Sequence, residues 1–130
     1  MKLISKKEKN PILMTEEDYR TIKRFLPYAH KDNRESLANE LERAIILNKF
    51  AFPKHAIRLN SVVSVLEVKS NRVLNFTIVA PGLANAAKKK LSVLTRLATA
   101  LIGFCKGQEV RWPMPGGMKT FKILDVVNTA

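Results

Sequence analysis

Three consecutive lysines, Lys88, Lys89 and Lys90, are the side chains of this chain best suited to bind a ligand through charge. Clustered cations can neutralise phosphate groups, and further basic residues could extend such a patch: Arg96, Lys106 and Arg111. Few aromatic side chains lie near them in the sequence, so stacking on single-stranded bases has little support. The lysines therefore indicate a basic patch that acts by electrostatics.

The net charge of +12 is concentrated in the second part of the chain. Residues 51–130 carry 12 Lys/Arg against three acids, Glu67, Glu109 and Asp125, whereas residues 1–50 carry 11 Lys/Arg and 8 Asp/Glu. A basic C-terminal part predicts attraction to nucleic acid, to an acidic protein surface or to anionic lipid. Charge alone does not choose among these partners.

Two carboxylates stand at Asp-x-x-Glu spacing in Asp32-Asn33-Arg34-Glu35. The favoured interpretation is a capping box, with Asp32 as the N-cap of a helix and Glu35 as its N3 residue. Contact of this acidic tip with a partner is the alternative.

The sequence lacks the residue patterns of common catalytic and metal sites. Gly117-Met118-Lys119-Thr120 fails as a phosphate-binding loop, because Met118 separates the glycine from the lysine. His30 and His55 are isolated in predicted loops, and the one cysteine, Cys105, cannot build a zinc centre. We therefore expect no enzyme activity, no metal and no cofactor.

The single Cys105 also suits a reducing compartment, since it cannot pair within the chain. Residues 1–9 are basic but lack the apolar core of a signal peptide, and no apolar run approaches the roughly 18 residues of a membrane span. These features predict a cytoplasmic, soluble protein that is not inserted in a membrane.

Helical signals occur in the first part of the chain, after a predicted flexible basic tail over residues 1–14. Thr15 is a good N-cap, and the three acids that follow it favour the positive end of a helix, which Pro27 ends. A second helix should begin after Asp32 or Asn33 and continue to about Asn48, with a mostly apolar stripe at helical spacing. We expect a short antiparallel helical hairpin, or coiled-coil arm, over residues 15–50.

Strand signals dominate residues 51–130. Residues 57–68 and 73–80 suggest a hairpin around Ser70-Asn71-Arg72, residues 91–94 a third strand, and 97–104 a short helix. Residues 109–113 and 118–127 form a last pair around Pro115-Gly116-Gly117. The fold class expected is α+β, with a twisted antiparallel sheet and one packed helix.

The segment Leu91–Val127 resembles the C-terminal domain of the Gre-type transcript cleavage factors, and most closely their short relatives, the regulators of nucleoside diphosphate kinase (Rnk). The likeness rests on the helix end Ala100-Leu101-Ile102-Gly103 and on the hairpin Trp112-Pro113-x-Pro115-Gly116-Gly117. Asn60-Ser61-Val62-Val63 also resembles the opening strand of the family. The resemblance implies an FKBP-like domain over residues 51–130.

The resemblance also implies a function. A protein of this family is expected to dock on RNA polymerase near its secondary channel and to regulate transcription elongation without catalysis, competing with Gre factors, as a monomer. The implied contact residues are Pro81, Gly82, Asn85, Thr95 and Arg96, with the three lysines supplying electrostatics. In Gre factors an acidic pair at the tip helps to hold a metal ion in the polymerase active centre. The short predicted helices here argue against that role for Asp32 and Glu35.

The chain departs from the family pattern in the predicted contact loop. The loop that matches Pro81–Ala87 is acidic in Gre proteins, whereas here it contains no acid and runs into the lysines. Charge steering toward a basic polymerase surface would then be lost or reversed. The alternative function is a nucleic-acid-binding module, for DNA or RNA, that uses the basic C-terminal domain. A prolyl isomerase is a weaker alternative, based on fold analogy alone.

Overall fold

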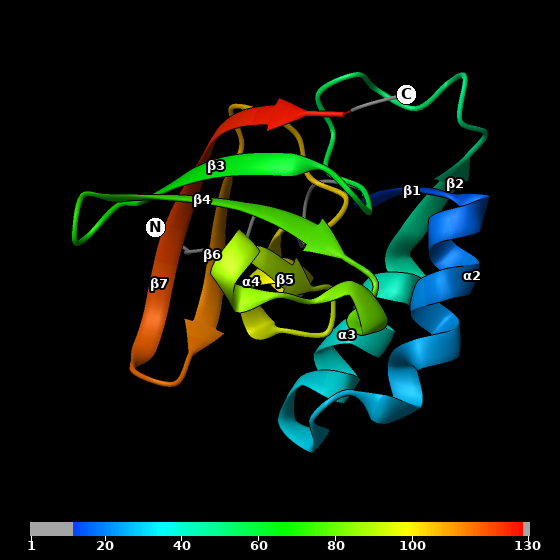
Figure 1. Cartoon of the computed structure of the whole chain (residues 1–130), viewed down its shortest axis with the longest axis horizontal. Coiled ribbons are helices and arrows are strands. Elements are labelled where there is room, and N and C mark those ends of the chain that lie inside the picture. The colour runs from blue at the N-terminus through cyan, green and yellow to red at the C-terminus, as the bar shows by residue number, and fades with distance from the viewer. Residues whose placement is uncertain (1–11, 129–130) are drawn as a thin grey trace.

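The computed structural model describes residues 12–128, so the expectations for residues 1–11 and 129–130 lie outside the described part of the chain. The fold is mixed α+β, with a curled five-stranded sheet and helices gathered beside it (Figure 1). The strand order is β5-β4-β3-β7-β6. None of the helices described is long and apolar enough to cross a membrane.

Two predicted hairpins form the body of this sheet. β3 (Val62–Glu67) pairs antiparallel with β4 (Arg72–Val79), and β6 (Glu109–Met114) pairs antiparallel with β7 (Gly117–Val127). Their turns use residues at positive φ, Asn71 at 57° and Gly117 at 120°, which are backbone conformations that Asn and Gly tolerate. β3 and β7 pair antiparallel and join the two hairpins. Local turn chemistry was therefore sufficient to predict both hairpins.

The sequence predicted an antiparallel sheet, and this prediction is wrong for one strand. β5 (Lys90–Ser92) pairs parallel with β4, from Thr77 opposite Lys90 to Val79 opposite Ser92. The connection carries two short 3-10 turns, η2 (Pro81–Leu83) and η3 (Ala86–Lys88), which reverse the chain before it meets β4 again. A parallel neighbour needs such a crossover, whereas a tight turn would have produced an antiparallel one.

One face of the sheet builds the core against α4 (Arg96–Leu101) and the N-terminal helices. Along β3 the buried Val63 and Val65 alternate with more exposed neighbours, as expected for a strand with one covered face. Phe76 and Trp112 are both buried and belong to this core. Thr95 caps α4 by accepting the amide of Ala98 on its hydroxyl at 3.3 Å.

Two helices precede the sheet, joined by the 3-10 turn η1 (Leu26–Tyr28) that contains Pro27. α2 (Glu16–Phe25) begins at the predicted cap, where the Thr15 hydroxyl accepts the Asp18 amide at 3.2 Å. α3 (Lys31–Arg43) begins earlier than predicted. Its N-cap is His30, whose Nδ1 accepts the Asp32 amide at 3.3 Å, so the capping box predicted for Asp32 and Glu35 is wrong.

A small second sheet replaces the expected end of the tail and the expected last turn of the second helix. β1 (Ile12–Thr15) and β2 (Ala44–Leu47) pair parallel, from Ile12 opposite Ala44 to Thr15 opposite Leu47. The β-branched pair Ile45-Ile46 favours a strand over a helix, and β1 supplies the partner. The tail interpretation of residues 12–14 and the helical one of residues 44–48 are therefore both wrong.

The N-terminal elements and the sheet share one apolar core. Ile12, Met14, Ile22 and Leu37 are almost completely buried and belong to the same cluster as the inward-facing residues of the five-stranded sheet. Gly103 (φ +86°) lies so close to β1 that a Cβ there would stand 2.2 Å from Ile12 Cγ2. Its carbonyl also accepts the Leu13 amide at 3.1 Å. The helices are therefore packed against the sheet domain.

Candidate docking surface

The loop from Pro81 to Lys90 has a defined backbone, although most of its side chains are exposed. Asn85 Oδ1 accepts the Lys88 amide at 3.2 Å, and the backbones of Asn85 and Lys90 exchange two hydrogen bonds of 3.0 and 2.9 Å. Lys89 adopts a left-handed conformation (φ 54°), and its carbonyl accepts the Thr77 amide at 2.9 Å. We call Lys88–Lys90 the tri-lysine turn.

The tri-lysine turn lies in a stretch of sequence without acidic residues. Its three side chains are exposed, and within residues 12–128 none of them forms a salt bridge. Leu83, on η2, has 60% of its surface exposed. Residues 68–108 contain no aspartate or glutamate at all. The loop thus combines an exposed aliphatic side chain with unneutralised positive charge.

Two residues predicted for separate sites meet in the structure. Arg96, on the first turn of α4, lies 3.6 Å (Nη2 to Oδ2) from Asp32 near the start of α3. Asp32 also lies 3.7 Å from Nδ1 of His30. The carboxylate assigned to the acidic tip is thus beside the arginine assigned to polymerase contact, whereas Glu35 is exposed on α3.

Asn33 connects α3 to the loop before α4, a role that the sequence analysis missed. Its Nδ2 donates to the Leu94 carbonyl at 2.8 Å and to the Thr99 hydroxyl at 2.9 Å. The Thr99 hydroxyl in turn donates to the Val93 carbonyl at 3.1 Å. Asn33 is buried and precedes Leu37 by four residues and Leu41 by eight, so the three side chains lie on the same face of α3. A polar residue on this apolar face was the sequence feature that could have revealed the role of Asn33.

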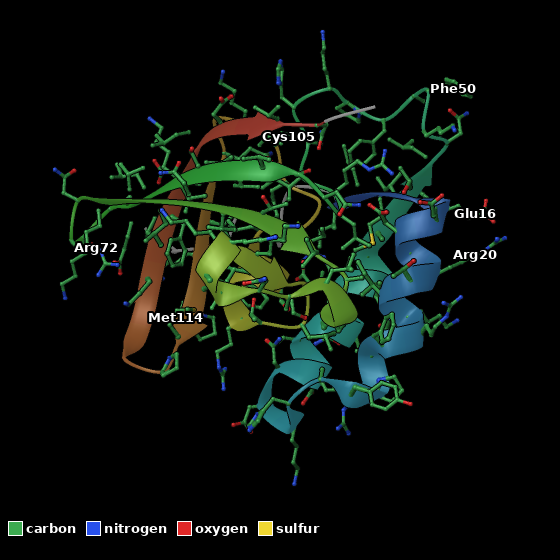
Figure 2. All side chains as sticks on the ribbon, viewed as in Figure 1. Glu16, Arg20, Phe50, Arg72, Cys105 and Met114 are labelled. Atoms are coloured by element: carbon green, nitrogen blue, oxygen red, sulfur yellow. The ribbon has the colours of Figure 1, made fainter. Side chains whose placement is uncertain are left out.

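Asp18 provides a second connection between the helices and the sheet domain. It is buried, its Oδ2 accepts the Leu59 amide at 3.0 Å, and the Nε of Arg58 lies 3.6 Å from the same oxygen. Burial raises the pKa of Asp18, against the opposing effects of the Leu59 amide and the Arg58 charge. Figure 2 shows Glu16 and Arg20, by contrast, paired on the exposed side of α2. From the sequence alone, Asp18 is predicted only to favour the N-terminus of a helix.

The remaining residues of the predicted basic patch lie on other elements. Lys106 is paired with Asp125 on β7 at 3.4 Å, and Arg111 lies on β6, the edge strand opposite β5 in the sheet order. The tri-lysine turn leads directly into β5. The structure therefore keeps the three lysines together but does not join Lys106 and Arg111 to the same segment.

The described residues contain no group of three or more His, Cys, Asp and Glu side chains arranged to hold a metal ion. His30 caps α3, and His55 Nδ1 lies 3.4 Å from the Val126 carbonyl. Burial raises the pKa of the Cys105 thiol, which disfavours its reactive thiolate form.

Comparison with known proteins identifies the family of the sheet domain. The family model described as transcription elongation factor, GreA/GreB, C-term matches residues 53–128. GreA of Aliarcobacter butzleri is 30% identical over 86 residues, which are 66% of this chain and 53% of that protein. The regulator of nucleoside diphosphate kinase of Escherichia coli K12 is 29% identical over 93 residues, 72% of this chain and 68% of that protein. The chain thus matches about half of the first relative and about two thirds of the second.

Solved structures extend the similarity to the N-terminal elements. A GreA/GreB factor of Nitrosomonas europaea has a TM-score of 0.75 at 27% identity, covering 92% of this chain and 99% of that chain. Gfh1 of Thermus aquaticus, with a TM-score of 0.52 at 19% identity, shares the fold. The match over residues 53–128 covers more than half of the sequence, and the chain therefore belongs to the GreA/GreB C-terminal family of transcription elongation factors.

Proposed function

We propose that this protein binds RNA polymerase as a monomer and regulates transcription without catalysing a reaction. Membership of the GreA/GreB family supports an association with the transcription machinery. The proposed location is near the mouth of the polymerase secondary channel, where the protein would compete with Gre factors. We also propose that the sheet domain has an FKBP-like fold.

The attachment of α3 to the sheet domain is the observation that carries the non-catalytic part of this proposal. Asn33 and Asp32 are bound to the segment before α4 and to Arg96, so the acidic tip is tied to the body of the protein. α3 has 13 residues, which corresponds to about 20 Å at 1.5 Å per residue. A carboxylate held in this way is poorly placed to deliver a metal ion deep into another protein.

The proposed contact surface consists of the loop after β4 and the start of α4. The residues that we assign to it are Pro81, Gly82, Asn85, Thr95 and Arg96, with the tri-lysine turn beside them. Pro81 and Gly82 begin the loop at η2, whereas Thr95 and Arg96 begin α4 next to Asp32. A partner that contacts both segments would also contact the Arg96–Asp32 ion pair.

Retention of purified core RNA polymerase by the immobilised protein, in the absence of nucleic acid, tests the binding proposal. Added GreA should displace the polymerase, and the protein itself should not stimulate transcript cleavage by a stalled elongation complex. A failure to retain polymerase would reject the proposal. Cleavage that is lost in Asp32→Asn would instead show that the acidic tip is active.

A nucleic-acid-binding module is the second candidate, because residues 68–108 lack acids and include the unpaired tri-lysine turn. Binding to DNA or RNA through phosphates should weaken steeply with salt, in proportion to the number of phosphates neutralised. Titration of a labelled single-stranded oligonucleotide at several salt concentrations separates this candidate from polymerase binding.

A further inference from the structure

We infer that the loop from Pro81 to Lys90 recognises an acidic segment of a protein partner that also presents an apolar side chain. This inference rests on the proposed function. It requires that the polymerase surface facing this loop be acidic, which is the reverse of the basic surface that the acidic loop of Gre proteins suits. The tri-lysine turn would receive the carboxylates, and Leu83 would receive the apolar group.

The hydrogen bonds that hold the backbone of the loop support a recognition role. Asn85 bonds to Lys88 and Lys90, and the Lys89 carbonyl bonds to β4, so the base of each lysine is fixed. A loop that is already ordered loses less conformational entropy when it binds than a flexible one does. The lysine side chains remain free to align with their partner's charges.

The local charge favours a partner of opposite sign. The three ammonium groups have no salt bridge within the described chain, and the acid that precedes the segment, Glu67, is bound to Lys119 at 3.0 Å. Complementary charge across an interface accelerates association and fixes orientation. An acidic counter-surface is therefore the partner that fits.

The apolar content of the loop favours protein over nucleic acid. Leu83 is 60% exposed, and the exposed alanines at 84, 86 and 87 provide further aliphatic surface. Residues 81–90 contain no aromatic side chain on which a base could stack. The outer edge of β5 is partly covered, because Asn85 forms an antiparallel bridge with Lys90. Side chains would therefore make the contact, and strand addition would not.

The test measures the affinity of purified core RNA polymerase, free of nucleic acid, for three forms of the full chain over a salt series. These are the wild type, the triple variant Lys88→Glu, Lys89→Glu, Lys90→Glu, and a control with the same change in net charge, Lys49→Glu, Lys54→Glu, Lys69→Glu. The turn variant should weaken binding by about tenfold or more and the control by less than about threefold.

A second pair of variants tests the apolar part of the contact. Leu83→Ser should weaken polymerase binding by about threefold to tenfold with an unchanged salt dependence, because it removes buried area but no charge. Val73→Ser, at an exposed residue of β4 outside the loop, should leave the affinity unchanged. Circular dichroism and thermal unfolding of every variant confirm that folding is intact.

The outcomes separate this inference from the proposed function. Wild-type binding with equal losses in both triple variants would overturn the inference and leave polymerase binding standing. Binding of a 20-nucleotide single-stranded RNA that only the turn variant loses, while polymerase binding is unchanged, would overturn it in favour of nucleic acid. No wild-type binding to polymerase would overturn both.

Discussion

The side-chain amide of Asn33 donates to the carbonyl of Leu94 at 2.8 Å, although 61 positions separate the two residues in the chain. This contact joins the first turn of α3 to the segment that leads into α4, and Arg96 reinforces it through Asp32. These contacts attach α3 to the sheet domain, and substitution of Asn33 tests how much they contribute to stability.

Asn33→Ala should lower the free energy of unfolding by about 1–3 kcal/mol, because it leaves the partly buried Leu94 carbonyl and the buried Thr99 hydroxyl with one partner fewer. Urea denaturation followed by circular dichroism measures the change. Asn39→Ala, at an exposed asparagine on the same helix, is the matched control and should change stability by less than about 0.5 kcal/mol. Equal effects of the two variants would show that the Asn33 contacts contribute nothing specific.

Asp18 should make stability depend on pH. Its folded pKa lies above the ordinary value of 3.8 because of burial, so the folded state binds the proton more tightly than the unfolded state. The contribution of this group to stability is therefore fully present below pH 3.8 and is lost as the pH rises through the folded pKa. The free energy of unfolding is measured as a function of pH for the wild type and for Asp18→Asn. The difference between the two curves gives the contribution of Asp18 to the pH dependence of stability.

Glu35→Gln is the control for that experiment, because Glu35 is exposed on α3 and is not among the groups that shift the pKa of Asp18. Its profile should retain the wild-type slope above pH 3.8. A wild-type profile identical to that of Asp18→Asn would contradict the assigned role of the buried carboxylate.

Gly103→Ala should destabilise the protein by about 1–3 kcal/mol, because a Cβ at φ +86° is strained and would collide with Ile12 Cγ2. Gly82→Ala is the matched control, since nothing lies within 4 Å of the added Cβ there and its φ is not in the left-handed region. Thermal unfolding compares the two. A stable Gly103→Ala variant would mean that β1 can move away from Gly103 at little cost.

Thr95→Ala should lower stability by about 1 kcal/mol, because it removes the hydroxyl that caps α4 at the Ala98 amide. Thr95→Ser keeps the hydroxyl and should retain most of the stability. Chemical denaturation measures the change in the free energy of unfolding, and the affinity for polymerase is measured separately. A loss of affinity in Thr95→Ser without a loss of stability would indicate that the threonine methyl group contacts the partner directly.

Much of the sheet domain could be predicted from short stretches of sequence. The β3–β4 and β6–β7 hairpins follow from β-branched runs around turns with Asn71 and Gly117, and α2 follows from the Thr15 cap. The family resemblance likewise depended on contiguous residues, and the match over residues 53–128 confirms it. These features are local, since a cap or a turn is decided by residues a few positions apart.

The candidate surface could be predicted only in part. The exposed lysines were visible because three like charges in a row are rarely buried. Their separation from Lys106 and Arg111 was not visible, because the order of strands in the sheet determines it.

The sequence by itself determined the two hairpins, the Thr15 cap of α2 and the family. Only the tertiary structure decided that residues 12–15 and 44–47 pair as strands, that Asn33 and Asp18 attach the helices to the sheet domain, and that Asp32 lies beside Arg96. The physical reason is that each of these contacts joins distant segments whose own patterns permit more than one structure. The free energy of burying one shared core selects among those structures.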